Sequence, residues 1–244
     1  VLAEQEEHIK QRTLELERSN NALKEFSTFA AHNLKEPLRK ILVFSGRIQE
    51  VIDVEPGGIA QQYLDGMGRS AERMNSLIDD LLKLSQVASQ GTNFRKVDLN
   101  KVVAEVIEDL EPNYPDSRKN ISVQSLPKVD ADKTQMYQLF KNLLSNSLKY
   151  AKADEPPMIS MEVEMNGDRH YLISIRDNGI GFDEKYKEKI FKPFERLHGQ
   201  SQYSGTGIGL AICKKVVESH NGELDVESQM NVGSTFTIRL PKSS

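Results

Sequence analysis

The chain has 244 residues, of which 38% are hydrophobic and 28% charged, and its net charge is −4. This length and apolar content suffice for one large core or two smaller ones, and nothing in the slight negative charge suggests a binding surface for nucleic acid. A single cysteine, Cys213, excludes an internal disulfide and is typical of a reducing compartment such as the cytoplasm. No apolar run reaches membrane-spanning length. Because the first residue is valine, we expect the sequence to be part of a longer chain.

Residues 1–24 predict a coiled-coil linker. Apolar side chains recur every seven residues from Leu2 to Ala30, whereas the second core position of the repeat is polar, at Glu6, Thr13, Asn20 and Ser27. A helix with one apolar and one polar seam pairs weakly, and we expect it to form a parallel dimer. The alternative is a solvated helix that packs on its own domain.

Residues 25–90 predict a helical hairpin, with a turn at "DVEPGG" (53–58). One hairpin buries little apolar surface, so we expect two copies to pair into a four-helix bundle. The helical periodicity assigns to the bundle core a stripe that consists of Leu34, Leu38, Ile41, Phe44, Ile48, Val51 and Ile52 in the first helix, and Ile59, Tyr63, Met67, Ser70, Met74, Leu77, Leu81 and Leu84 in the second.

Residues 98–244, after a linker over 91–97, predict an α+β sandwich separate from the hairpin. Asp98 and Asp132 stand where a helix N-cap is expected. The helical patterns cover 97–110, 132–152 and 207–221, and the strand patterns cover 120–126, 158–165, 171–179, 222–228 and 233–241.

Three polar side chains share one face of the helix that begins near Asp132. Asn142, Asn146 and Lys149 are spaced by four and three residues, which places them side by side. Two carboxamides and an ammonium group can together hold a hydrated Mg²⁺ and a phosphate oxygen. The alternative is an ordinary polar face in contact with water.

Two glycine-rich stretches follow. In "RDNGIGFD" (176–183), Asp177 ends a strand where its carboxylate can accept a hydrogen bond from an exocyclic amine such as that of adenine, and Gly179 and Gly181 allow a sharp turn. Alone, this pattern is also typical of a plain turn. In "GTGIGLAI" (205–212), backbone amides and a helix N-terminus suit a polyphosphate, although the spacing is neither that of a Walker loop nor that of a dinucleotide fingerprint.

The segment 184–204 between these loops is charged and interrupted by Pro193, and predicts a flexible lid anchored by Phe191 and Phe194. An ordinary surface helix is the alternative. Among the histidines, His32 on a solvent-facing helix is the candidate nucleophile. Of the other four, His8, His170 and His220 lack a surrounding constellation and His198 lies in the lid segment, so all four are interpreted as incidental.

Six motifs together resemble, in order, the conserved boxes of two-component sensor histidine kinases. They are "AHNLKEPLRK", "NLLSNSLKY", "DNGIGF", "FKPF", "GTGIGL" and "GSTFTIRLP". The ending "EPLRK" is most similar to kinases attached to phytochrome-type or PAS-type sensors. The resemblance implies a phosphotransfer hairpin joined to a Bergerat-fold ATP-binding domain, ATP and Mg²⁺ as cofactors, a homodimer, a response-regulator receiver domain acting in trans, and a sensor domain upstream.

The resemblance also implies residue roles. His32 is the phosphoacceptor, and Pro37 bends its helix. Asn146 binds Mg²⁺ with help from Asn142, Lys149 meets phosphate, Tyr150 flanks the base and Asp177 accepts the adenine amine. The remaining nucleotide-binding positions are Gly179, Gly181, Gly205, Thr206, Gly207, Gly209, Leu210 and Thr235.

Two positions depart from the family pattern. Asn33 replaces the usual acidic residue after the histidine, and an amide cannot take the imidazole proton or offer negative charge. Glu36, one helical turn further on, can partly replace it, but its charge repels an aspartyl phosphate and disfavours phosphatase activity. Two alternatives to an active kinase follow: a kinase-like dimeric scaffold that binds ATP with little phosphotransfer, and an unrelated Bergerat ATPase, which the histidine-bearing hairpin disfavours.

Overall fold

The computed structural model describes residues 31, 33–49, 58–89, 93–167, 169–197, 203 and 205–242. The chain divides into two compact units between Ser89 and Gln90, which we call the hairpin unit and the sheet unit and describe separately. The predicted coiled coil, most of the predicted turn and His32 lie outside the described residues. None of the helices in the described ranges is long and apolar enough to cross a membrane.

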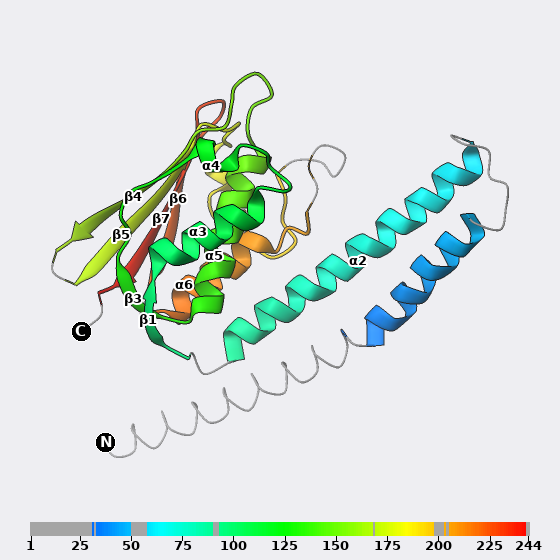
Figure 1. Cartoon of the computed structure of the whole chain (residues 1–244), viewed down its shortest axis with the longest axis horizontal. Helices are drawn as coiled ribbons and strands as arrows, with labels where there is room; N and C mark the ends of the chain where they lie inside the picture. Colours follow the sequence, from blue (N-terminus) through cyan, green and yellow to red (C-terminus); the bar gives the residue numbers. More distant parts are fainter. Residues whose placement is uncertain are drawn as a thin grey trace, which may run out of the picture. The chain divides into compact units, whose positions relative to one another are not determined.

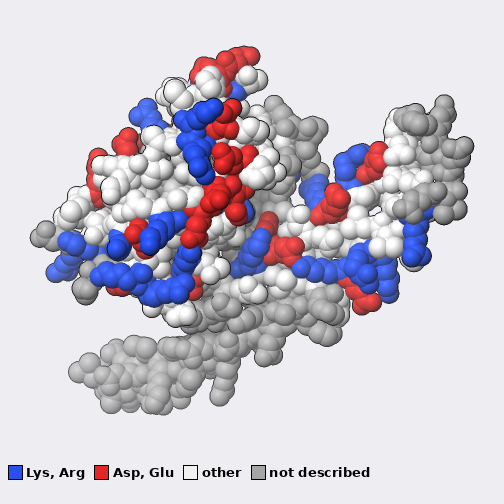
Figure 2. All heavy atoms as spheres, viewed as in Figure 1, with Lys and Arg blue, Asp and Glu red and all other residues white. Residues whose placement is uncertain are grey.

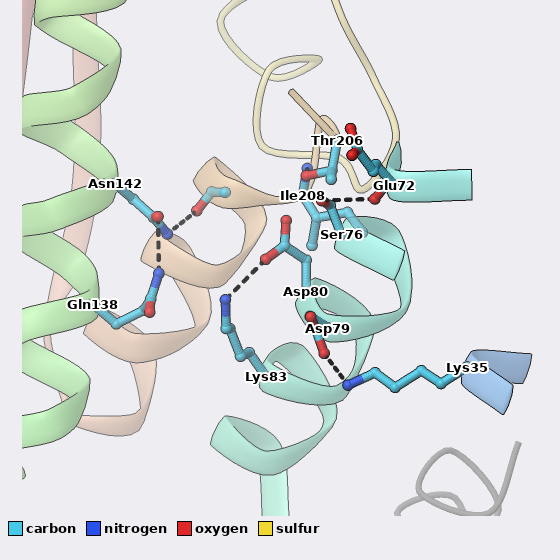
Figure 3. Close-up of polar contacts among 11 residues, drawn as sticks. Lys35, Glu72, Ser76, Asp79, Asp80, Lys83, Gln138, Asn142, Thr206 and Ile208 are labelled. Atoms are coloured by element: carbon cyan, nitrogen blue, oxygen red, sulfur yellow. Dashed lines mark hydrogen bonds and ion pairs between the residues drawn. The ribbon is translucent and has the colours of Figure 1, made fainter. Parts of the chain in front are cut away.

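The hairpin unit pairs a helix over 33–49 with helix α2 (Ile59–Ser89) (Figure 1). The first helix continues without interruption through Pro37. Polar contacts fix an antiparallel register: Ser45 Oγ donates to the Leu64 carbonyl at 3.3 Å, and an ion pair joins Lys35 to Asp79 further along (Figure 3).

Alanine and branched aliphatic side chains line the inner seam of this hairpin. Ala31, Leu38, Ala71 and Ile78 form its buried cluster, against which Leu42 and Leu82 pack. Of the stripe that was predicted for the bundle core, Leu38 is buried, whereas most of the other large apolar side chains are exposed. Phe44 is 58% exposed and Tyr63 is 71% exposed. The single hairpin thus leaves an apolar outer face, which consists of Leu34, Ile41, Phe44, Ile48, Ile59, Tyr63, Met67, Met74 and Leu81.

The sheet unit contains a five-stranded mixed sheet in the order β2-β4-β5-β7-β6, in which only β2 and β4 run parallel. A second sheet pairs β1 with β3. The strands are β1 (Arg95–Asp98), β2 (Ile121–Val123), β3 (Lys128–Ala131), β4 (Ile159–Asn166), β5 (His170–Asp177), β6 (Glu223–Gln229) and β7 (Gly233–Pro241). The helices are α3 (Leu99–Leu110), α4 (Ser117–Asn120), α5 (Lys133–Lys149), the 3-10 turn η1 (Glu184–Tyr186) and α6 (Gly209–Ser219).

Helices α3, α5 and α6 cover one face of the large sheet (Figure 1), which confirms the predicted α+β sandwich. Both predicted N-caps are confirmed: a side-chain oxygen of Asp98 accepts from the Asn100 amide, and Asp132 accepts from the first turn of α5. The core between helices and sheet is mostly apolar, and its largest buried side chains include Phe140, Leu139, Leu143, Leu144, Ile173, Ile175, Ile212 and Ile238.

Strands β1 and β3 were not predicted. Each has four residues and contains charged side chains, so neither carries a strong local signal. Their antiparallel pairing, with Val97 opposite Val129, buries one valine from each strand. Residues 95–97 of the predicted linker therefore belong to β1.

Two other expectations need correction. Phe191 is 9% exposed, as its predicted anchoring role requires, but Phe194 is 59% exposed and adopts a positive φ of 67°. Phe194 is therefore not an anchor in this structure. His220 is not incidental to the fold, because it is buried and its Nε2 accepts from the Asp132 amide at 3.1 Å. It ties the end of α6 to the start of α5.

Candidate functional site

Asp177 ends β5 with its carboxylate beside α5 and the loop that follows. Its Oδ1 accepts the Gly179 amide at 2.9 Å and the Ser234 amide at 3.2 Å. Its Oδ2 accepts the Ser147 hydroxyl of α5 at 3.2 Å. Burial raises the pKa of this carboxyl group, and the three hydrogen bonds oppose that rise. The result is a half-buried acceptor held in a fixed orientation.

The loop after Asp177 is held tightly by its neighbours. The Ile180 amide donates to the Tyr150 carbonyl at 3.0 Å, and the Ile180 carbonyl accepts from the Asn231 amide at 2.7 Å. A side chain at Gly179 would stand 2.6 Å from the Tyr150 carbonyl oxygen. Gly181 has a φ of +57°, and a side chain there would stand 2.0 Å from the Gln229 carbonyl oxygen. Both glycines are therefore required by the shape of this loop.

Strand register separates Thr235 from this group. Ser234 lies opposite Asp177 and Ser228, and its hydroxyl is 2.9 Å from the Ser228 hydroxyl. Thr235 instead lies opposite Arg176 and Glu227, so the alternation of side chains places it on the other face of the sheet. Ser234, for which the sequence pattern indicates no role, is the residue of β7 next to Asp177.

On α5, Asn142 is already engaged in two hydrogen bonds. Its Nδ2 donates to the Gly209 carbonyl at 3.1 Å, and its Oδ1 accepts from Gln138 Nε2 at 2.9 Å (Figure 3). Asn142 thus ties α5 to the first turn of α6. Gln138 was missed in the sequence, although its position four residues before Asn142 places both on one helical face.

Lys149 and Tyr150 meet the glycine-rich segment before α6. The ammonium group of Lys149 lies 4.4 Å from the centroid of the Tyr150 ring, and a side chain at Gly205 would stand 3.0 Å from it. The Tyr203 ring packs on Tyr150 with a centroid distance of 4.8 Å. Arg196 donates to the Gly205 carbonyl at 2.9 Å and also to the Tyr203 carbonyl.

The next residues lead directly into α6. The Phe194 amide donates to the Gly207 carbonyl at 3.0 Å, and Gly207 has a φ of +79°. Thr206 Oγ1 accepts from the Ile208 amide at 3.3 Å (Figure 3). Helix α6 then begins at Gly209, followed by the half-buried Leu210, and no side-chain hydrogen bond caps its N-terminus. The helix N-terminus therefore faces this segment.

The structure thus brings predicted residues from both glycine-rich stretches to the second half of α5: Asp177 contacts Ser147, Gly205 lies near Lys149, and Gly209 lies near Asn142. Elsewhere on the sheet unit, charges of both signs lie side by side on the face that Figure 2 shows. Two ion pairs of this kind, Lys133–Glu105 and Lys141–Asp109, connect α5 to α3.

A magnesium ion would find few ligands in the protein itself. No group of three or more His, Cys, Asp or Glu side chains among the described residues is placed to hold a metal. The Asn142 oxygen already accepts a hydrogen bond from Gln138, whereas no hydrogen bond joins the Asn146 side chain to another described residue. One amide oxygen fits an ion that is held mainly by phosphate oxygens and water, as Mg²⁺ often is in nucleotide sites.

In the hairpin unit, Asn33 and Glu36 are exposed on the first helix. The Glu36 carboxylate lies 3.3 Å from the Lys40 ammonium group, one helical turn further on. This contact between exposed groups is weak and leaves the Glu36 carboxylate accessible.

Comparisons with known proteins give one result for each unit. Residues 131–244 match the family described as "Histidine kinase-, DNA gyrase B-, and HSP90-like ATPase". Residues 22–90 match the "His Kinase A (phospho-acceptor) domain". These matches confirm the predicted combination of a phosphotransfer hairpin with an ATPase domain.

Similar proteins agree with this result. Cyanobacterial phytochrome A of Nostoc sp. (strain PCC 7120) is 36% identical over 99% of this chain and 31% of its own length. The chain spans about a third of the curated relatives it matches. Full-length ShkA in complex with AMPPNP matches 90% of this chain and 46% of its own, with a TM-score of 0.66 at 20% identity. The histidine kinase ThkA in complex with the response regulator TrrA matches 90% and 61%, with a TM-score of 0.58 at 24% identity. At these identities the two structures show a shared fold.

Proposed function

We propose that this chain, which belongs to the histidine kinase family, transfers the γ-phosphoryl group of ATP to its own His32 and then to an aspartate of a response regulator. The observation that carries the proposal is the fixed Asp177 acceptor in the first glycine-rich stretch, which contacts the same helix α5 that the second stretch meets, in a chain whose other unit matches a phospho-acceptor domain. The imidazole of His32 would act as the nucleophile in an in-line displacement.

Different residues of the sheet unit would bind the adenine base and the phosphates of ATP. Asp177 Oδ2 would accept the amine of adenine, and Tyr150 would flank the base. Ser234, rather than Thr235, would support the base pocket, because it lies on the Asp177 side of β7. Lys149 and the backbone amides from Gly205 to Gly209 would bind phosphates at the N-terminus of α6.

Asn146 would hold Mg²⁺ together with the nucleotide phosphates, and the ion would neutralise charge on the transferred group. We assign Asn142 a different role from the one expected from the sequence, because its amide already joins Gln138 of α5 to the Gly209 carbonyl of α6. It would keep the start of α6 against α5, so that Gly205, Thr206, Gly207, Gly209 and Leu210 surround the phosphates.

A homodimer would cover the apolar outer face of the hairpin unit. Large side chains such as Phe44 and Tyr63 are exposed along both helices, and a second hairpin presents the same face. We therefore propose a four-helix bundle, continued by a coiled coil over residues 1–24. The shared fold with ThkA, which is in complex with a response regulator, supports a receiver domain as the partner that takes the phosphoryl group.

A scaffold that binds ATP but transfers little phosphate is the second candidate. It is favoured by Asn33, which cannot accept the imidazole proton from a phosphorylated His32. The exposed Glu36 carboxylate is the nearest replacement on the same helix, and its pairing with Lys40 is weak. Active kinase and scaffold therefore differ in the amount of phosphohistidine formed.

The test is incubation of the chain with γ-labelled ATP and Mg²⁺, alongside His32→Ala, Asn33→Asp and a His8→Ala control. An active kinase acquires acid-labile, base-stable label that is lost in His32→Ala and kept in His8→Ala. General-base help is worth about 10²–10⁴-fold, so Asn33→Asp is expected to accelerate labelling by up to that range. Bound ATP without label in the unsubstituted chain would support the scaffold instead.

A further inference from the structure

Ser147 stands at the centre of the proposed base pocket without belonging to the polar face that the sequence indicates. It follows Asn146 on α5, and its side chain is directed into the protein, where the residue is 4% exposed. Its hydroxyl lies 3.2 Å from Asp177 Oδ2 and 3.3 Å from the Leu143 carbonyl oxygen, one turn back on the helix.

A hydroxyl has one proton, so only one of these oxygens receives it at a time. The carboxylate is the stronger acceptor because a hydrogen bond to a charged oxygen is roughly twice as strong as one between neutral groups. The Ser147 proton is therefore directed to Asp177 Oδ2. Since Oδ1 already accepts from Gly179 and Ser234, the remaining acceptor capacity of the carboxylate is on Oδ2, next to the Ser147 contact.

Neutral donors alone stabilise the charged form of Asp177. Burial raises the pKa of the carboxyl group, and the bonds from Gly179, Ser234 and Ser147 lower it. The neighbouring elements contribute no ion pair among the described residues: Arg176 is on the opposite face of β5, and the Lys149 ammonium group is held over the Tyr150 ring. On β7 and β6 the groups facing Asp177 are the serines at 234 and 228. Loss of one of these hydrogen-bond donors therefore destabilises the Asp177 carboxylate more than it would if a neighbouring cation also stabilised the charge.

We propose that Ser147 is a positioning residue for base recognition, whose hydroxyl keeps Asp177 an acceptor and so favours a 6-amino purine over a 6-oxo purine. This inference rests on the proposed function, since it concerns the same pocket. A carboxylate accepts a hydrogen bond from the amine of adenine. A protonated carboxyl group can instead donate to the 6-oxo oxygen of inosine, so the protonation state of Asp177 determines which base is preferred.

The experiment measures nucleotide binding by calorimetry between pH 5.5 and 8.5, in the full chain carrying His32→Ala to prevent transfer. The ligands are the magnesium complexes of ATP, inosine triphosphate and purine riboside triphosphate, which has no substituent at position 6. The variants are Ser147→Ala and Ser147→Thr, which keeps a hydroxyl. Ser145→Ala is the matched control, because Ser145 is on the same helix and donates to the Asn142 carbonyl.

In Ser147→Ala we expect ATP affinity to fall about three- to tenfold near neutral pH, and its decline on acidification to begin about one pH unit higher. Inosine triphosphate should bind no more weakly, and purine riboside triphosphate should be nearly unaffected. Ser147→Thr and Ser145→Ala should behave like the parent.

Two results would overturn the inference while leaving the proposed function intact: an unchanged pH midpoint for ATP, or an equal loss for all three nucleotides, which would indicate a general packing defect. If the parent chain binds none of the three nucleotides, the proposed function fails, and this inference fails with it.

Discussion

Replacing Gly181 by alanine is expected to destabilise the sheet unit far more than the same change at Gly167. Both glycines have positive φ values, +57° and +64°. A side chain at Gly167 would meet no atom within 4 Å, whereas one at Gly181 would stand 2.0 Å from the Gln229 carbonyl oxygen. The pair therefore separates backbone strain from steric overlap.

The expected magnitudes follow from these contacts. The left-handed conformation costs a non-glycine residue about 1–2 kcal/mol, and this is the whole effect expected at Gly167. At Gly181 the loop must also move. Movement breaks the bonds from Asn231 to the Ile180 carbonyl and from Phe182 to Ser228 Oγ, each worth about 0.5–1.5 kcal/mol. We therefore expect a loss of about 2–5 kcal/mol.

Hydrogen exchange read by mass spectrometry gives the opening free energy of the slowest amides in β5 and β7, and so reports on the sheet unit separately from the hairpin unit. Gly181→Ala should also weaken ATP binding, because the displaced loop carries the Gly179 amide that orients Asp177. Equal destabilisation by the two substitutions would refute the reasoning, since it would mean that the overlap with Gln229 is relieved without cost.

Three further outcomes are expected. Burial lowers the pKa of His220 below its ordinary value of 6.5, so the unfolded chain binds a proton at His220 more readily than the folded chain does. The contribution of His220 to stability should therefore be complete above about pH 6.5 and decrease below it. His220→Gln should flatten the dependence of the urea midpoint on pH in this acidic range. Gln138→Ala removes the donor that orients Asn142 and should weaken ATP binding by up to about tenfold in calorimetry, with Gln62→Ala on α2 as a control that leaves it unchanged. Phe44→Glu should convert the dimer to a monomer in sedimentation velocity, and a parent chain that is already monomeric at micromolar concentration would contradict the proposed bundle.

Local sequence patterns predicted the elements that carry strong local signals. The capping aspartates Asp98 and Asp132 mark the starts of α3 and α5 because a short acidic side chain satisfies the free amides of a first turn. Period-two alternation similarly predicted β4, β5 and β7 to within two residues at each end. The spacing of Asn142, Asn146 and Lys149 and the order of the glycine-rich stretches indicated a nucleotide site from the sequence alone.

Contacts between distant residues decided the rest. Strands β1 and β3 form only by pairing with each other across about 30 residues, and no local pattern reveals such a partner. Whether Ser234 or Thr235 of β7 lies beside Asp177 depends on strand register, which shifts a side chain to the other face with each residue. The hydroxyl of Ser147 and the amide of Gln138 acquire their roles only when β5 and α6 pack against α5. The sequence by itself therefore determined the types of element and the chemistry present, while the tertiary structure decided which of those groups meet, because hydrogen bonds and side-chain packing depend on distances that linear spacing does not specify.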